Sequence, residues 1–133
     1  MEALSEKIFL KLDMPNDQNR RGDRDKIFDA LKEKYGQVIM PYKILKELYP
    51  KCREANFEIT VTLARRDYDW VVTKIECGDT THNHYGLCVD LGSTTVIMRL
   101  VDLNTGNIIT EECIFNKEIK FGEDILNRIF YTR

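Results

Sequence analysis

Apolar and polar residues alternate along several short stretches of the chain, and this pattern predicts β-strands. The alternation is regular over residues 57–63, so one face of this strand is expected to be buried and the other exposed. A polar turn over residues 65–69 leads back into a partner strand at residues 70–77. Residues 7–13 are predicted to form an earlier short strand, which ends where Pro15 follows.

Two segments between these strands have the spacing of helices that bury one face. Residues 23–35 place apolar side chains three and four positions apart, and Gly36 follows as a stop. Pro41 opens a second helix, because proline is favoured in the first turn. Pro50 falls inside the continuing pattern and predicts a kink or a break into two short helices. The apolar positions are Ile27, Phe28 and Leu31 in the first helix, and Ile44, Leu45 and Leu48 in the second.

These elements predict a chain made of two parts. Residues 1–77 contain a small β-α-α-β-β unit, and residues 78–84 form a polar joint without apolar content. Residues 85–133 make up the second part. Its strands are expected at residues 85–91, 94–103 and 107–115, and its helix at residues 121–131.

The composition indicates a globular protein without a bulk affinity for nucleic acid or membranes. The 133 residues are 43% hydrophobic and 32% charged, and 22 acidic residues nearly balance 20 basic ones. Apolar runs are only strand-sized, and the first residues lack the basic and apolar regions of a signal peptide, so we expect a cytoplasmic protein. The four cysteines do not pair at short spacing and are expected to be reduced, buried thiols.

The residues after the first strand of the second part have the chemistry of a phosphate-binding turn. The sequence Val89-Asp-Leu-Gly-Ser-Thr-Thr95 places a carboxylate near a strand end, a glycine at the turn and three hydroxyl residues behind it. Glycine lets the backbone approach a phosphate, while amides and hydroxyls donate to its oxygens. Asp90 would repel a phosphate, so its natural role is to position hydrated Mg²⁺ or the attacking water.

A tight hairpin with polar turn residues and a solvent-facing aspartate would produce the same short pattern. The pattern alone gives these two interpretations about equal weight. Two further features favour the phosphate site. Asp90 interrupts an otherwise apolar strand, which costs stability unless the carboxylate has a partner. The next strand and its turn at residues 102–106 have the length expected of a following hairpin.

Four residues near the joint offer an alternative, a zinc site. Their spacing is not a common one for structural zinc, and one of the cysteines belongs to a predicted strand. The favoured interpretation is therefore a polar joint with solvent-exposed histidines. The four residues are Cys77, His82, His84 and Cys88.

A resemblance to known proteins extends well beyond the turn. Asp90-Leu-Gly-Ser-Thr-Thr95 resembles the first phosphate loop of the ASKHA superfamily of sugar kinases, heat-shock chaperones and actin. More narrowly, residues 53–129 resemble the ATP-dependent reductive activators of corrinoid proteins, and residues 7–50 resemble the linker segment of that family more loosely. The motifs that carry this resemblance are Arg53-Glu-Ala-Asn-Phe-Glu-Ile-Thr-Val61, Gly78-Asp-Thr-Thr81, Tyr85-Gly-Leu-Cys-Val-Asp-Leu-Gly-Ser-Thr-Thr-Val96, Asp102-Leu-Asn-Thr-Gly106 and Phe121-Gly-Glu-Asp-Ile-Leu-Asn-Arg-Ile129.

The resemblance implies a fold, a function and site residues. The fold would be α+β, with a small β-α-α-β-β linker domain before the first β-meander and helix of an actin-like (RNase H-like) ATPase domain. The family uses ATP hydrolysis to permit electron transfer from an iron–sulfur centre to Co(II) of an inactive corrinoid protein in methyl-transfer metabolism. By this resemblance Asp90 would be the catalytic residue that organises Mg²⁺ or water. The phosphate of ATP would be cradled by Gly92, Ser93, Thr94 and Thr95.

The chain also departs from the family pattern. Asn116-Lys117-Glu118 stands where the family usually has Asn-Pro-Gln. The four isolated cysteines do not supply the spacing of [2Fe-2S] ligands, so the cluster would belong to another domain of the parent protein. The second phosphate loop and the adenosine-binding loop are expected beyond Arg133. We therefore expect that this chain alone neither hydrolyses ATP efficiently nor carries the cluster.

An incomplete ATPase domain would leave apolar surface uncovered. A short meander and one helix leave a sheet edge and a helix face without partners. We therefore expect self-association, as in a homodimer, or packing against residues 7–77. Two other functions stay open on the sequence: a non-catalytic interaction or dimerisation module, and part of another actin-like-fold sugar or acyl kinase.

Overall fold

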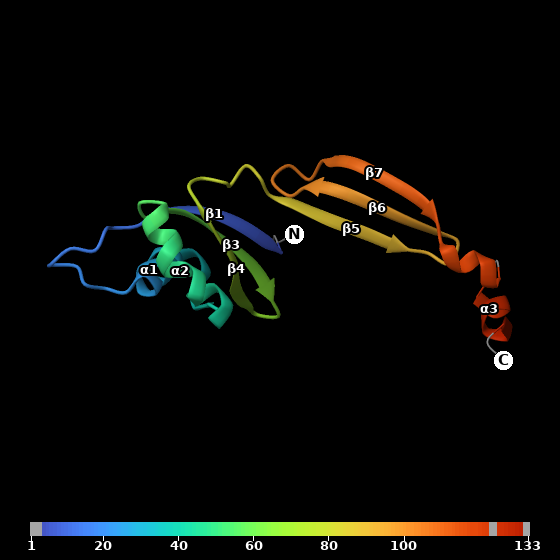
Figure 1. Cartoon of the computed structure of the whole chain (residues 1–133), viewed down its shortest axis with the longest axis horizontal. Helices are drawn as coiled ribbons and strands as arrows, with labels where there is room; N and C mark the ends of the chain where they lie inside the picture. The colour runs from blue at the N-terminus through green and yellow to red at the C-terminus, as the bar shows by residue number, and fades with distance from the viewer. Residues whose placement is uncertain (1–3, 123–124, 132–133) are drawn as a thin grey trace. The chain divides into compact units, whose positions relative to one another are not determined.

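The computed structural model describes residues 4–122 and 125–131. The chain divides after His82 into two compact units, each of which is described by itself. The first unit is mixed α and β, and the second is a meander followed by short helices. The α+β class expected from the sequence is thus confirmed (Figure 1).

The first unit is a four-stranded sheet with two helices on one face (Figure 1). The strand order is β1-β3-β4-β2, and all neighbours are antiparallel except β2, which runs parallel to β4. The two-residue strand β2 was not predicted. Its elements are β1 (Ser5–Lys11), α1 (Asp23–Tyr35), β2 (Val38–Ile39), α2 (Tyr42–Glu54), β3 (Glu58–Arg66) and β4 (Asp69–Cys77).

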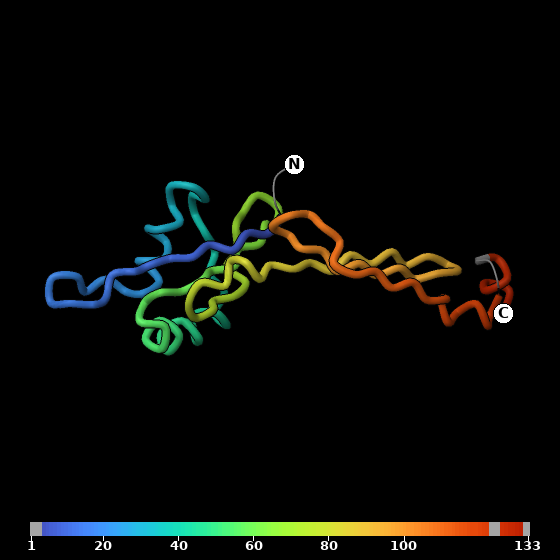
Figure 2. The backbone as a smooth tube through the Cα atoms, turned by 90° about the horizontal axis from the view of Figure 1, so that it is seen from above, coloured from blue at the N-terminus to red at the C-terminus, as the bar shows by residue number. Residues whose placement is uncertain are grey.

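The core of this unit lies between the helices and one face of the sheet. Alternate residues of β3 point into it, and Ile59, Val61 and Leu63 have no exposed surface. Residues 12–22, between β1 and α1, extend away from this core in both views (Figures 1 and 2). The helical contribution to the core comes from Ile27, Leu31, Tyr35, Ile44, Leu48 and Cys52.

Of the two outcomes expected at Pro50, a kink or a break into two helices, the break does not occur: α2 runs without interruption from Tyr42 to Glu54. Proline removes one backbone hydrogen bond and strains the preceding turn, at a cost of about 3 kcal/mol in a helix interior. Burial offsets that cost here. The apolar stripe continues past Pro50, since Ile44, Leu48 and Cys52 are all buried.

The other face of the sheet is polar and is partly covered by the residues that follow β4. The hydroxyl of Thr60, which is fully buried, donates to the carbonyl of Gly78 at 2.6 Å and accepts from the amide of Thr80 at 2.9 Å. The ammonium group of Lys7 reaches the hydroxyl of Thr80 at 3.0 Å and the carboxylate of Glu76 at 2.6 Å. The first residues of the predicted joint are therefore bound to the first unit.

The second unit is an antiparallel meander followed by two helical segments. The strand order is β5-β6-β7. The bounds of these strands differ from the predicted ranges by at most one residue at each end. The predicted helix over residues 121–131 is shorter than expected and follows a 3₁₀ turn; residues 123–124 lie outside the described part. The elements are β5 (Tyr85–Leu91), β6 (Thr95–Asp102), β7 (Ile108–Phe115), η1 (Lys117–Phe121) and α3 (Ile125–Tyr131). In the part of the chain that the structure describes, every helix is too short or too polar to cross a membrane.

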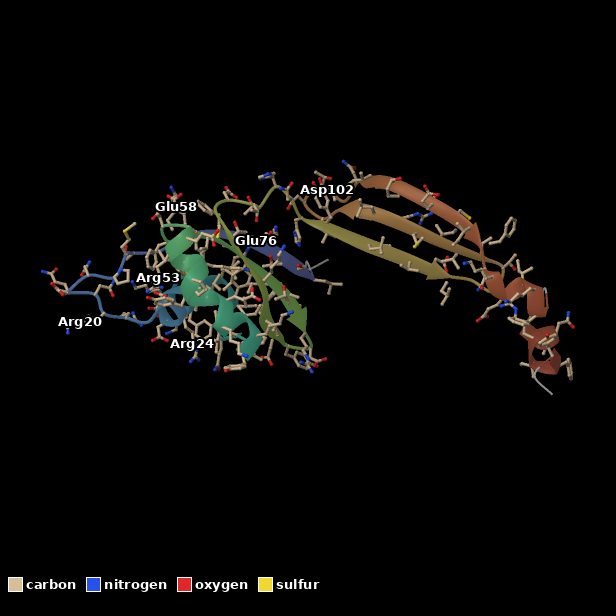
Figure 3. All side chains as sticks on the ribbon, viewed as in Figure 1. Arg20, Arg24, Arg53, Glu58, Glu76 and Asp102 are labelled. Atoms are coloured by element: carbon tan, nitrogen blue, oxygen red, sulfur yellow. The ribbon has the colours of Figure 1, made fainter. Side chains whose placement is uncertain are left out.

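The sheet of the second unit lacks a covering layer among the described residues of that unit. Side chains stand on both of its faces (Figure 3). On one face of β5 the side chains of Leu87 and Leu91 are 65% and 75% exposed. The expectation of buried thiols is corrected as well. Only Cys52 is buried, whereas the exposed thiols are those of Cys77, Cys88 and Cys113.

Candidate phosphate-binding turn

The turn between β5 and β6 is closed by its glycine. The amide of Gly92 donates to the carbonyl of Thr95 at 2.9 Å. A Cβ atom at Gly92 would lie 2.7 Å from that same backbone oxygen, closer than real Cβ contacts permit. Glycine is therefore required here by the close approach of two backbone segments, whether or not a ligand is bound.

The carbonyl oxygens of this turn are taken up by two residues from later in the chain. The side-chain amide of Asn116 donates to the oxygen of Gly92 at 2.9 Å, and its backbone amide donates to the oxygen of Thr94 at 2.8 Å. The guanidinium of Arg128 donates to the oxygen of Ser93 between them. Four successive carbonyls, from Gly92 to Thr95, are thus hydrogen-bonded within the protein.

The donors of the turn have no such partners. Within the described part of the chain, the amides of Ser93 and Thr94 donate to no protein acceptor, and both side chains are exposed. Adjacent amides that point into solvent bind anions, because each can donate to an oxygen of the same phosphate. Of the four predicted residues, Gly92 and Thr95 are thus bonded to each other, whereas Ser93 and Thr94 keep backbone donors without a protein acceptor.

Asp90 lies two residues before the turn, on the less apolar face of β5. It pairs across the sheet with Ile97, whereas Leu87, Val89 and Leu91 occupy the opposite face. Because Asp90 is exposed, it does not interrupt a buried apolar surface, which corrects the argument that it costs stability without a partner. Its carboxylate is open to water or a hydrated cation.

Arg99, on the same face of the sheet as Asp90, belongs to an ion pair. Arg99 on β6 donates to the carboxylate of Glu111 on β7. The pKa of Arg99 is raised, first by this hydrogen bond and the charge of Glu111, and to a smaller extent by the charges of Cys88 and Asp90. Arg99 is thus engaged with Glu111 and does not neutralise Asp90 directly.

Asn116 and Arg128 were not among the predicted site residues, although both lie in segments that the family resemblance covers. Asn116 begins the segment that departs from the family pattern, and Arg128 lies in the motif that begins at Phe121. No local pattern in either segment points to the turn. Their roles depend on contacts across 24 and 35 residues of sequence.

The alternative of a zinc site near the joint has no geometric support. Among the described residues, no group of three His, Cys, Asp or Glu side chains could hold a metal ion. His84 is buried at 7% exposure, which corrects the expectation that both histidines are solvent-exposed. Its carbonyl accepts a hydrogen bond from the amide of Leu103 at 2.8 Å, and this bond ties the start of β5 to the end of β6.

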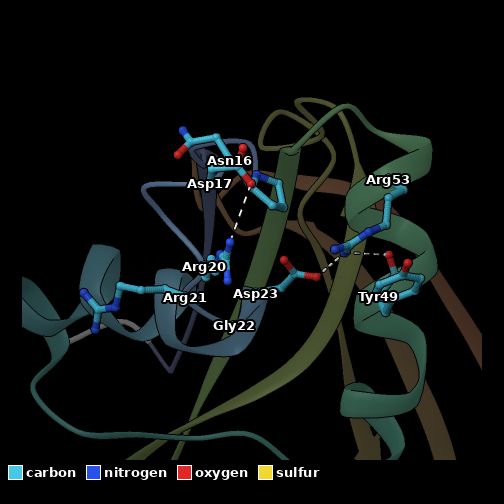
Figure 4. Close-up of a pocket in the computed structure, with 9 residues that line it drawn as sticks. Asn16, Asp17, Arg20, Arg21, Gly22, Asp23, Tyr49 and Arg53 are labelled. Atoms are coloured by element: carbon cyan, nitrogen blue, oxygen red, sulfur yellow. Dashed lines mark hydrogen bonds and ion pairs between the residues drawn. The ribbon is translucent and has the colours of Figure 1, made fainter.

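The first unit has a hollow of its own, between residues 15–23 and the end of α2 (Figure 4). Its charged groups are already paired, because Arg53 donates to Asp23 and Arg20 lies 3.8 Å from Asp17. The guanidinium of Arg53 also covers the ring of Tyr49, 3.6 Å from its centroid. The hollow is wide open, and its charged side chains are already paired with one another. It is therefore a weaker candidate for a ligand site than the turn of the second unit.

Comparison with known proteins gives matches along nearly the whole chain. A family model described as the RACo linker region matches residues 1–82, and one described as the RACo middle region matches residues 85–133. A solved structure described as a reductive activator for corrinoid, iron–sulfur protein matches with a TM-score of 0.84 at 30% identity, over 98% of this chain and 21% of that one. The corrinoid activation enzyme RamQ of Eubacterium limosum is 38% identical over 48 residues, which are 36% of this chain and 8% of RamQ. The chain thus spans a small share of the length of these relatives.

Proposed function

The chain belongs to the RACo family, and from this premise we propose that it supplies the linker domain and the first phosphate loop of an ATP-dependent reductive activator of corrinoid proteins. Family membership favours this function over that of a sugar or acyl kinase with an actin-like fold. In this proposal residues 1–77 are the linker domain, residues 78–84 the joint, and residues 85–133 the start of the ATPase domain. The corrinoid protein is the partner on which the parent protein acts.

The observation that supports the proposal is the arrangement of donors and acceptors at the turn. The carbonyls of residues 92–95 are bound within the protein, which leaves the amides of Ser93 and Thr94 as donors for phosphate oxygens. The exposed carboxylate of Asp90 fits a hydrated Mg²⁺ or the attacking water. Bound ATP would supply the free energy of its hydrolysis.

The described residues do not fit the iron–sulfur cluster that the family resemblance implies. The four thiols come from separate elements: Cys52 lies in α2, Cys77 in β4, Cys88 in β5 and Cys113 in β7. A [2Fe-2S] centre needs four ligands converging on one point, and these residues form no such group. We therefore assign no step of the electron transfer to this chain.

A nuclear magnetic resonance titration with MgATP tests the proposal. We expect the amide signals of Ser93 and Thr94 to shift as the MgATP concentration rises into the millimolar range, because a single phosphate loop should bind with only about 4 kcal/mol. The amide of Gly106, in the turn at the other end of β6, is the internal control. Asp90→Ala should reduce the response to MgATP toward that seen with ATP and no Mg²⁺.

Two results would contradict the proposal. One is a spectrum in which the Ser93 and Thr94 signals stay fixed up to ~10 mM MgATP, a range that detects binding of about 3 kcal/mol. The other is steady ATP turnover by this chain that Asp90→Ala abolishes, because the chain would then hold a complete catalytic site. A weak, Mg²⁺-dependent response without turnover is the expected outcome.

A second candidate function, a non-catalytic interaction or dimerisation module, is favoured by the uncovered sheet of the second unit. The apolar face of this sheet carries Leu87, Val89 and Leu91, which are all more than half exposed. Sedimentation equilibrium would detect self-association through this face, and Val89→Asp should abolish it. This second function predicts that the chain binds a second copy of itself, or a corrinoid protein, without nucleotide. The double variant Ser93→Ala with Thr94→Ala should leave that binding unchanged.

A further inference from the structure

We infer that Asn116 and Arg128 are positioning residues, which hold the turn between β5 and β6 in the shape that presents two adjacent N–H groups to a phosphate. The inference rests on the proposed function, because it concerns the same site. It adds two residues that lie outside the turn. They follow their acceptors Gly92 and Ser93 by 24 and 35 residues.

The direction of the free amides follows from the bonded carbonyls. A trans peptide group is planar, so its C=O and the next N–H point in opposite directions. Asn116 holds the oxygen of Gly92, and the N–H of Ser93 must therefore point away from Asn116. Arg128 holds the oxygen of Ser93, which orients the N–H of Thr94 in the same manner. The two residues thus determine where both donors point.

Arg128 is suited to this role by the number of groups that it joins. Its Nε donates to the carbonyl of Gly122 at 3.0 Å, and one terminal nitrogen lies 3.2 Å from the carboxylate of Glu118. The other terminal nitrogen donates to Ser93, and the side chain is only 14% exposed. A planar guanidinium with five donors can bridge three acceptors, whereas the single ammonium of a lysine presents a point charge.

Gly122 allows α3 to approach closely enough for these contacts. Its φ is +141°, a value that residues with a Cβ rarely adopt. A Cβ there would lie 2.6 Å from the Cβ of Asn127 and 3.0 Å from the backbone nitrogen of Arg128. Because residue 122 has no Cβ, Asn127 and Arg128 of α3 can pack directly against it. From this position the side chain of Arg128 reaches the carbonyl of Ser93 in the turn.

Asn116 has two separable roles. Its side-chain oxygen accepts from the amide of Glu118 at 3.0 Å and so caps η1. Its side-chain NH₂ group donates to Gly92, which is the contact that positions the turn. Asn116→Ser keeps a good capping residue and its backbone N–H, but it removes the NH₂ group. This substitution separates positioning from capping.

The experiment compares the wild-type chain with Asn116→Ser, Arg128→Gln and Arg128→Lys. Arg99→Gln is the matched control, because it removes an arginine of the same unit that is paired with Glu111 and not with the turn. Two quantities are measured: the heteronuclear ¹⁵N NOE of the Ser93 and Thr94 amides, and the affinity for magnesium pyrophosphate. The NOE needs no ligand, so it reports the order of the turn independently of phosphate binding.

We expect Asn116→Ser and Arg128→Gln to lower the NOE at Ser93 and Thr94, while the control Arg99→Gln leaves it unchanged. Loss of one hydrogen bond to the turn should weaken pyrophosphate binding by about three- to tenfold. The NOE and the pyrophosphate affinity of Arg128→Lys should lie between those of the wild type and Arg128→Gln, because lysine keeps the charge but cannot donate to several acceptors in the fixed geometry of a guanidinium. The NOE of Gly106, in the opposite turn, should stay constant, which a general loss of stability would not allow.

The outcomes distinguish this inference from the proposed function. An unchanged NOE and affinity in Asn116→Ser and Arg128→Gln, with pyrophosphate bound by the wild type, would overturn the inference alone. A turn that loosens in both variants, in a chain that binds no pyrophosphate at any concentration, would support the positioning role and overturn the proposed phosphate site. An equal loss in the Arg99→Gln control would also refute the inference.

Discussion

Replacing Lys7 by methionine should destabilise the first unit strongly, because it leaves Glu76 inside the polar face of the sheet without its main partner. The side chains of this ion pair are 7% and 20% exposed, and the N–O distance is 2.6 Å. The same ammonium also donates to the hydroxyl and the carbonyl of Thr80, at 3.0 and 3.2 Å. Breaking a largely buried pair costs 3–5 kcal/mol, and the partial exposure of Glu76 and its remaining contact with Lys74 lower our estimate to about 2–4 kcal/mol.

The chain offers a matched control on the same strand. Lys11 pairs with Glu58 at 2.9 Å, but these side chains are 70% and 50% exposed. An exposed pair contributes roughly 0–1 kcal/mol, so Lys11→Met should have little effect. The double variant Lys7→Met with Glu76→Met should recover most of the loss, because it removes the buried charge together with its partner.

Urea unfolding followed by tryptophan fluorescence measures these changes. The single tryptophan, Trp70, lies in β4, 5.2 Å from the ring of Tyr35, so its emission reports the first unit. A loss of under ~1 kcal/mol in Lys7→Met, the size expected of an exposed pair, would refute the argument from burial. So would equal losses in the Lys7 and Lys11 variants.

The effect should also depend on pH. Burial opposes ionisation of Glu76, but its hydrogen bonds with Lys7 and Lys74 outweigh burial and keep the pKa of this carboxyl below its usual value. A depressed carboxyl pKa adds stability above the unfolded value of about 4.3, and this stability is lost as the pH falls through the folded value. The difference between wild type and Lys7→Met should therefore be largest near neutral pH and shrink toward pH 3.

Three further predictions concern single residues. Asp67 has a φ of +55° in the turn between β3 and β4, so Asp67→Gly should raise the free energy of unfolding by about 0.5–1 kcal/mol in urea titrations, while Asp67→Ala should not raise it. Gly92→Ala should broaden or shift the amide signals of its turn, because the new Cβ meets a backbone oxygen at 2.7 Å; an unchanged spectrum would contradict the close approach. Burial raises the pKa of Cys52 to about 11, so brief iodoacetamide treatment at pH 8 should label Cys88 and Cys113 and spare Cys52, as mass spectrometry of the peptides would reveal.

Much of the local structure could be predicted because it depends on local periodicity. The first helix has its predicted range of residues 23–35, and β5 has its predicted range of residues 85–91. In both cases the apolar spacing and the flanking turn residues lie within the segment itself. The turn residues that we propose to bind phosphate could be singled out for the same reason, since they are consecutive in the chain.

The features that were missed depend on partners far away in the sequence. Strand β2 has only two residues, and it exists because β4 provides a parallel neighbour. The sequence left open whether the second helix would break at Pro50, and α2 continues because its apolar residues are buried on both sides of the proline. The histidine that was expected to be exposed, His84, is buried at the start of β5. A sequence pattern carries none of this information, because each outcome depends on packing.

By itself the sequence determined the order of the longer elements, the position of the turn and the donors that it carries. A tight turn with glycine and hydroxyl residues is encoded within a few consecutive positions, where geometry follows from residue type. Only the tertiary structure decided which way the donors face, because the carbonyls of Gly92 and Ser93 are bound by Asn116 and Arg128. It also decided that the sheet behind the turn is uncovered in its own unit, since exposure depends on which elements pack together.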